Sequence, residues 1–212
     1  MNDQVETAKP APAPIVISSK PSMPPEGIER LTTELKRSTC FLEFGAGGST
    51  CLAASLGVPH IYSVESDKEY VKAVRKAVDA LASKSVLHSA TVNIGPTKEW
   101  GMPVNSDRAR HWPGYSLNVW EMLAKDEMRP DLALVDGRFR VACFLSCVLH
   151  MAPGTTILFD DYLGREQYHV VERHVPRAET VARMGVFKVP APEQLDLKAL
   201  AVDLATYSPN TA

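Results

Sequence analysis

Two kinds of hydrophobic pattern alternate along most of this chain. Short, nearly uninterrupted apolar runs predict buried strands at residues 40–44, 60–65, 86–94, 131–135 and 156–159. Between them, apolar residues three and four positions apart predict helices at residues 28–36, 49–56, 67–81, 117–125 and 141–150. Because strands and helices alternate, the pattern predicts an α/β fold with a doubly wound, mostly parallel sheet and helices on both faces.

The two ends of the chain follow other patterns. Six prolines in the first 25 residues, and no secretory signal pattern, predict a flexible, extended arm over residues 1–25, followed by a single domain over 26–212. Residues 167–174 predict a short helix, and residues 180–189 predict an antiparallel pair of strands at the edge of the sheet. The pattern assigns no element to residues 195–207.

Composition and charge narrow the class of protein. With 45% hydrophobic and 23% charged residues, the 212-residue chain has the composition of a globular domain, and no segment is apolar enough to predict a membrane span. A formal charge of −2 gives no broad basic surface, so we expect no bulk binding to nucleic acid. The four cysteines lie in or beside apolar runs, which favours a reduced, cytoplasmic protein: Cys40, Cys51, Cys143 and Cys147.

The most informative segment reads FLEFGAGGST, at residues 41–50. A strand here breaks into a glycine turn that opens a helix, and glycines let a ligand approach the main-chain N–H groups closely. Glu65 ends the next strand, twenty positions after Gly45, where a carboxylate can accept hydrogen bonds from both ribose hydroxyls. The pair predicts a nucleoside-binding site.

Two residues argue against NAD as the nucleoside. Thr50 stands where a dinucleotide-binding turn needs its third glycine. Glu43 would repel a pyrophosphate but suits a ligand with a cationic amine. An NAD-dependent oxidoreductase therefore remains the alternative reading, together with a protein that binds an adenosyl cofactor without catalysis.

The glycine segment resembles the first motif of the class I S-adenosylmethionine-dependent methyltransferases, in the form Glu-x-Gly-x-Gly-Gly-Ser-Thr. The resemblance covers about residues 26–189 and implies a Rossmann-like three-layer sandwich with an antiparallel edge. It implies methyl transfer from S-adenosylmethionine to an oxygen or nitrogen of a small acceptor. The cofactor-binding residues that it implies are Glu43, Gly45, Ala46, Gly47, Ser49, Thr50, Glu65 and Ser66.

Three acids follow two later strands: Asp136 after LALV, and Asp160 and Asp161 after TILF. Parallel strands end at one edge of the sheet, so these carboxylates should meet there, and a Mg²⁺ ion could neutralise them. The layout resembles the catechol O-methyltransferase branch, which implies a metal site at Asp136, Asp160 and Asp161, although no lysine follows Asp136. Equally, Asp136 could cap the next helix while the pair orients loops or the cofactor amine. The candidate catalytic residues are Asp136, Asp161 and Arg138.

The segment from Gly95 to Trp120 is expected to choose the substrate. Its aromatic and cationic side chains suit a planar, anionic or polyhydroxylated small molecule, with Trp120 predicted as core: Lys98, Trp100, Arg108, Arg110, His111, Trp112, Tyr115 and Trp120. Cys143, Cys147 and His150 share a helical spacing but are expected to be core rather than a metal site. Exposed edge strands and the apolar arm leave room for a homodimer.

Overall fold

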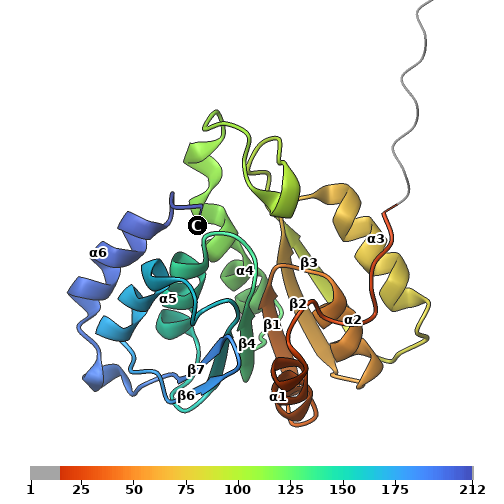
Figure 1. Cartoon of the computed structure of the whole chain (residues 1–212), viewed down its shortest axis with the longest axis horizontal. Helices are drawn as coiled ribbons and strands as arrows, with labels where there is room; N and C mark the ends of the chain where they lie inside the picture. Colours follow the sequence, from red (N-terminus) through yellow and green to blue (C-terminus); the bar gives the residue numbers. More distant parts are fainter. Residues whose placement is uncertain (1–14, 212) are drawn as a thin grey trace, which may run out of the picture.

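A seven-stranded sheet divides the molecule into two helical layers (Figure 1). The structure is a computed structural model and describes residues 15–211. The first five strands in the spatial order are parallel, and β7 runs antiparallel to both of its neighbours. In that order the strands are β3 (Val86–Thr91), β2 (His60–Glu65), β1 (Cys40–Phe44), β4 (Leu132–Val135), β5 (Thr156–Phe159), β7 (Met184–Lys188) and β6 (Glu179–Val181).

The helices are divided between the two faces of the sheet (Figure 1). One face is covered by α1 (Pro25–Leu35), α2 (Gly48–Ser55) and α3 (Lys68–Asp79). The other is covered by α4 (Pro113–Lys125) and α5 (Arg140–His150), with α6 (Leu197–Tyr207) packed on α5. Short 3₁₀ helices complete the chain: η1 (Glu99–Gly101), η2 (Ala109–His111), η3 (Glu166–Arg173) and η4 (Pro192–Gln194).

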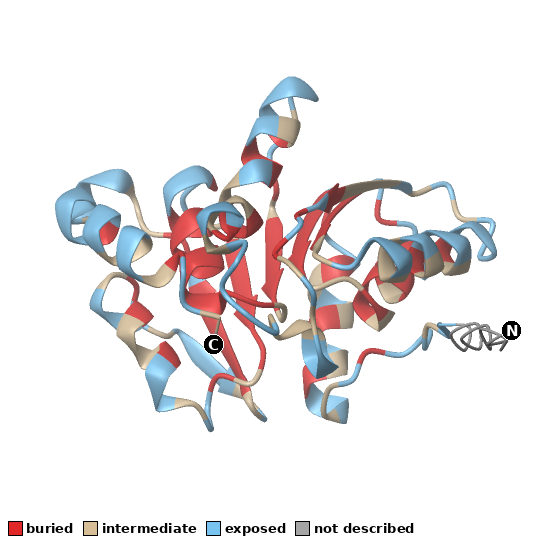
Figure 2. Cartoon of the chain, turned by 90° about the horizontal axis from the view of Figure 1, so that it is seen from above, coloured by how far each residue is buried: buried red, intermediate tan, exposed pale blue. Residues whose placement is uncertain are grey.

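Alternation along the strands builds one core on each face of the sheet. In β1, Phe41 packs in the layer of α1 to α3, whereas Leu42 and Phe44 pack in the layer of α4 and α5. The sheet and the inner faces of the helices are therefore buried, while the outer helical faces are exposed (Figure 2). Glu43 shares the face of Phe41, which places a carboxylate beneath α2.

The register of the strands determines where the site can form. Phe44 is aligned with Val64 of β2 and Val135 of β4, and Val135 is aligned with Phe159 of β5. The four strands thus end at one level, and the loops that follow them meet at the same edge of the sheet.

The structure confirms the predicted α/β class and the antiparallel edge, where β6 and β7 form a hairpin. Three strands have the predicted bounds, at 40–44, 60–65 and 156–159. The third strand ends early, at Thr91, and the predicted helix at 167–174 is the 3₁₀ helix η3. The unassigned residues 195–207 contain α6, whose Leu200 is buried in the core. Among the described residues, no helix has the length and apolar character needed to cross a membrane.

The predicted arm falls partly outside the described residues, which begin at 15. Its described part has no helix or strand before α1, which begins at Pro25. This part is not free of the domain, however, because Pro21 is buried and Ile17 and Met23 pack against the core beneath α1 and α2. Apolar contact thus holds part of residues 17–23 on the domain, and the flexible arm over residues 1–25 stays a prediction.

Candidate active site

A cavity of about 710 Å³ opens where the loops after β1, β2, β4 and β5 meet. Its size falls in the range of small-molecule sites in proteins. Five of the predicted cofactor-binding residues line it, namely Gly45, Ala46, Gly47, Ser49 and Glu65. Three of the predicted catalytic or metal residues also line it: Asp136, Arg138 and Asp161.

The glycine turn after β1 is in backbone contact with the loop after β4. Gly45 has a φ of +99°, and a Cβ there would lie 2.8 Å from the N and Cα atoms of Gly137. Only glycine accommodates both the backbone angle and this approach. The nucleoside turn and the acid-bearing loop therefore form one continuous wall of the cavity.

Glu43 lies behind this wall, fully buried and outside the cavity lining. Its carboxylate accepts hydrogen bonds from the hydroxyls of Ser49, at 2.6 Å, and of Thr50. Thr50 in turn accepts a bond from the main-chain N–H of Gly47, at 2.9 Å. Burial raises the pKa of Glu43 to about 7. Glu43 and Thr50 thus hold the turn in shape from within, whereas the sequence predicted that both would bind the cofactor directly.

Glu65 is on the cavity wall at the end of β2. Its Oε1 accepts bonds from the N–H and the hydroxyl of Ser66, at 2.6 and 3.0 Å, and from the N–H of Asp67, at 3.3 Å. Burial raises the pKa of Glu65, and these bonds oppose the rise. Ser66 does not line the cavity, so its place is beside the carboxylate that it orients. Tyr70 of α3 lines the cavity next to Gly47 and was not foreseen.

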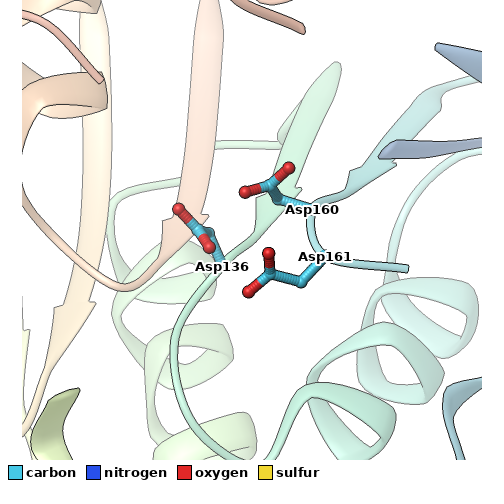
Figure 3. Close-up of side chains that lie close together, drawn as sticks. All are labelled: Asp136, Asp160 and Asp161. Carbon is cyan, nitrogen blue, oxygen red and sulfur yellow. The ribbon is translucent and has the colours of Figure 1, made fainter. Parts of the chain in front are cut away.

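The three predicted acids meet as expected, between the ends of β4 and β5 (Figure 3). Each offers one carboxylate oxygen, and these oxygens all lie within 4.8 Å of one another. Asp160 is fully buried and lies outside the cavity lining, whereas Asp136 and Asp161 are partly exposed to it. Asp161 has a φ of +57°, a conformation that asparagine and aspartate adopt more readily than most residues.

Three arginines neutralise this acidic cluster. Arg140 lies 3.2 Å from Asp136 and 3.2 Å from Asp161. Arg183, in the turn between β6 and β7, lies 2.6 Å from Asp160 and 3.0 Å from Asp161. Arg165 lies 2.9 Å from Asp161. Three formal positive charges therefore face three carboxylates.

This pairing decides how well a metal ion fits. Asp160 uses both of its carboxylate oxygens for Arg183, which donates from Nε and Nη2. A divalent ion would need the same oxygens and would lie among three guanidinium groups that repel it. The acidic cluster is therefore a poor match for Mg²⁺. Arg140 also donates to the main-chain oxygens of Gly137, Asp136 and Asp160, so it joins the loops after β4 and β5.

The acidity of Asp136 reflects its position between the ends of β4 and β5. Burial raises the pKa of Asp136 to about 7, and the nearby Arg140 opposes the rise. Asp136 is consequently a carboxyl group on the cavity wall whose charge changes near neutral pH.

The predicted substrate segment contributes only in part. Lys98 and Trp100 of the loop, and Tyr115 of α4, line the cavity, and the indole of Trp100 is 85% exposed. Arg108 and Arg110 are exposed and lie outside the lining, so the prediction that they face the substrate finds no support in the cavity geometry.

The aromatic residues at the other end of that segment belong to the core. Trp112 and Trp120 are buried, which confirms the prediction for Trp120. The ring of His150 stacks on Trp120 with 4.6 Å between centroids. Cys143 and Cys147 are buried with free thiols, whereas His150 is exposed at the end of α5, so the predicted core position is confirmed for the two cysteines only.

Sequence reasoning missed the contribution of the arm and of the edge hairpin. Pro21 and Ser22 line the cavity, and the carbonyl of Ser22 accepts a bond from Arg183 at 2.8 Å. These residues are far apart in sequence and show no periodicity or motif. Their meeting follows from the antiparallel insertion of β7, which the pattern of residues 180–189 only outlined.

Comparison with known proteins agrees with this geometry. The chain is 34% identical to a methyltransferase-like protein from Silicibacter pomeroyi, with a TM-score of 0.77 over 88% of this chain and 98% of that one. An O-methyltransferase from Bacillus cereus, solved with S-adenosylhomocysteine, is 14% identical with a TM-score of 0.55, covering 85% and 84%. The O-methyltransferase TomG from Streptomyces achromogenes, solved with S-adenosylmethionine, is 14% identical with a TM-score of 0.50, covering 79% and 80%. No protein-family model and no curated protein matches the chain.

The chain therefore belongs to the class I S-adenosylmethionine-dependent methyltransferase superfamily. Within it, the chain belongs to the same family as the methyltransferase-like protein of Silicibacter pomeroyi. The strand order supports this assignment independently, because an antiparallel β7 lies between β5 and β6. The NAD-binding fold has its sixth strand directly beside the fifth.

Proposed function

We propose that this protein transfers a methyl group from S-adenosylmethionine to an oxygen or nitrogen of a small acceptor. The observation that carries the proposal is the position of Glu65 on the cavity wall, with the glycine turn beside it, in a chain of this superfamily. An adenosine ligand needs both features, one for its ribose and one for close approach to the main chain.

Glu65 would hold the ribose of the cofactor. Its hydrogen bonds from Ser66 and Asp67 all use Oε1 and fix the carboxylate, the main-chain N–H of Ala46 also acts on it, and we propose Oε2 as the acceptor for a ribose hydroxyl. Gly45, Ala46 and Gly47 would lie against the methionine part. Glu43 and Thr50 would act through the shape of the turn rather than by touching the cofactor.

The second half of the cavity would receive the acceptor. Methyl transfer from an activated sulfonium needs mainly in-line positioning, so the wall must orient the acceptor and exclude water. Asp136 is the carboxyl group placed to take up a proton there or to face the cationic part of the cofactor. Because arginines already neutralise the acidic cluster, no metal ion is included in the proposal, and turnover should persist in strong chelator.

Calorimetric titration with S-adenosylhomocysteine tests the cofactor assignment. Replacing Glu65 by Ala should weaken binding by about 30-fold or more, because a charged hydrogen-bond acceptor for the ribose is lost. Glu69→Ala is the matched control, since it removes the same charge from an exposed site on α3 and should leave the affinity unchanged. Tight binding of NAD in place of S-adenosylhomocysteine, or equal affinity of Glu65→Ala and the parent, would contradict the proposal.

Two wider expectations accompany this function. The four cysteines are free and buried, and we propose that the protein works in a reducing compartment, the cytoplasm. The homodimer predicted from the arm and the edge strands is tested by the mass of the protein in solution, measured by light scattering.

A further inference from the structure

We infer that Arg138 forms an oxyanion subsite in the acceptor half of the cavity and that the methyl acceptor carries a carboxylate or phosphate group. The inference rests on the proposed function, because it assigns the cavity beyond the cofactor to the acceptor. It replaces Arg108 and Arg110, which lie outside the cavity, with a side chain that lines it.

Arg138 is a buried cation without a carboxylate partner. The residue is 8% exposed and lines the cavity. Within residues 15–211 no acidic side chain lies within 4.0 Å of its guanidinium, and Nη2 has no hydrogen-bond partner there. Its contacts are weak: Nε donates to the carbonyl of Gly137 at 3.3 Å, and Nη1 lies 3.9 Å from the sulfur of Met102.

This isolation costs free energy that a ligand could recover. Burial lowers the pKa of Arg138, and the neighbouring Arg140 and Arg165 lower it as well, while the phenols of Tyr168 and Tyr115 oppose them. A buried charge is normally paired, and a guanidinium pairs best with a planar carboxylate or with phosphate, through two parallel hydrogen bonds. An oxyanion bound in the cavity would complete this environment.

The other arginines of the cavity wall do not offer the same site. Arg140, Arg165 and Arg183 are each paired with carboxylates of the acidic cluster. Their charges are cancelled where they stand, so an incoming anion would have to break an ion pair to reach them. Lys98 is a second cation on the wall without an ion pair among the described residues, but it is exposed. Among the described cations that line the cavity, Arg138 is therefore the buried one whose charge is not paired with a carboxylate.

The surroundings of Arg138 indicate the kind of molecule that carries the anion. Its Cγ lies beside Gly101, which is followed by Met102 and preceded by the exposed Trp100. A small acidic molecule with a planar body could place its oxyanion on Arg138 and its ring against the indole of Trp100. The cofactor has a carboxylate of its own. The experiment must therefore distinguish binding of that carboxylate by Arg138 from binding of the acceptor's oxyanion.

The test uses protein saturated with S-adenosylhomocysteine and two probes, benzoate and inorganic phosphate, titrated by calorimetry. The parent should bind at least one probe, and Arg138→Gln should weaken that binding by about 10-fold or more, the usual effect of removing one member of a buried charge pair. Arg138→Lys should restore part of it. Arg108→Gln is the matched control, because it removes the same charge from the exposed part of the same region and should change the affinity by less than about twofold.

Each remaining result has a definite meaning. If neither probe binds the parent, or if Arg138→Gln binds the probes as the parent does, the inference is wrong. It is also wrong if Arg138→Gln weakens S-adenosylhomocysteine instead of the probes, because Arg138 then serves the carboxylate of the cofactor. Failure of the parent to bind S-adenosylhomocysteine would instead overturn the proposed function. Should Arg138→Gln not fold, parent crystals soaked in benzoate decide the question by density at Nη2 or its absence.

Discussion

The two halves of the cavity hold their carboxylates in different ways. In the half after β1 and β2, Glu43, Glu65 and Asp67 accept hydrogen bonds from hydroxyls and main-chain N–H groups. None of the three has an ion pair among residues 15–211. In the half after β4 and β5, all three acids of the cluster are paired with arginines.

Because of this difference, the two halves suit ligands of different charge. Neutral donors orient a carboxylate without placing a positive charge beside it, so the first half offers unpaired acceptors to a cationic ligand such as a sulfonium or ammonium group. Guanidinium groups cancel the charge, so the second half neither attracts a metal ion nor repels an anionic acceptor. The same type of side chain is thus hydrogen-bonded to neutral donors in one half and joins loops through arginines in the other.

Removing the central arginine of the half after β4 and β5 should have the largest effect on the free energy of unfolding. Arg140 has a side chain 5% exposed and joins two carboxylates and three carbonyls. Arg140→Met should lower the free energy of unfolding by about 3–5 kcal/mol, because it leaves Asp136 without its arginine partner and three main-chain carbonyls without their donor, while Asp161 keeps Arg165 and Arg183. Urea denaturation measures the loss, and addition of Mg²⁺ should restore part of it in this variant but not stabilise the parent.

Arg165→Met is the control for that experiment. Arg165 pairs with Asp161 alone and has a side chain 41% exposed, so its loss should cost less than about 1 kcal/mol. If both variants lose the same free energy of unfolding, the burial of Arg140 does not determine its contribution to stability. The proposed difference between the two halves of the cavity would then be wrong.

The same contrast explains which features could be predicted from the sequence. The bonds of the first half join residues close in sequence, as with Glu43 and Ser49, so one motif contains nearly the whole arrangement. In the second half, Asp160 and Arg183 are 23 positions apart, with η3 and β6 between them, and no local pattern predicts that pair. The sequence therefore predicted where the acids would meet and left open whether they bind a metal ion or orient loops, but it did not predict the arginines that pair with them. The apolar periodicity likewise predicted the parallel strands but not α6, whose assignment depends on packing against α5.

A substitution that forces the glycine turn after β1 away from the loop after β4 should have the next largest effect on the free energy of unfolding. Gly45→Ala places a methyl group 2.8 Å from the backbone of Gly137 at a φ of +99°, and it should lower the free energy of unfolding by about 3 kcal/mol. S-adenosylhomocysteine should bind more weakly to the variant as well. Gly57→Ala is the matched control: its φ is +75°, but a methyl group there would meet nothing within 4 Å, so it should cost about 1 kcal/mol. If both variants lose the same amount, the backbone angle alone matters and the close contact of the halves does not.

The last prediction concerns the pH dependence of stability in the half after β1 and β2. Burial raises the pKa of Glu43 from 4.5 to about 7, so between those values the folded protein holds a proton that the unfolded chain has lost. The stabilisation that this proton supplies is complete below pH 4.5 and disappears as the pH rises through about 7.

The side chain of Glu43→Gln cannot titrate. Its free energy of unfolding, measured with urea, should therefore rise relative to that of the parent by up to about 3 kcal/mol between pH 5 and pH 8. Glu69→Gln is a substitution on the exposed side of α3, and its free energy of unfolding should change with pH as that of the parent does. A gap between Glu43→Gln and the parent that stays constant over this range would mean that the hydroxyls of Ser49 and Thr50 keep the carboxylate ionised throughout, and burial would then not control its protonation.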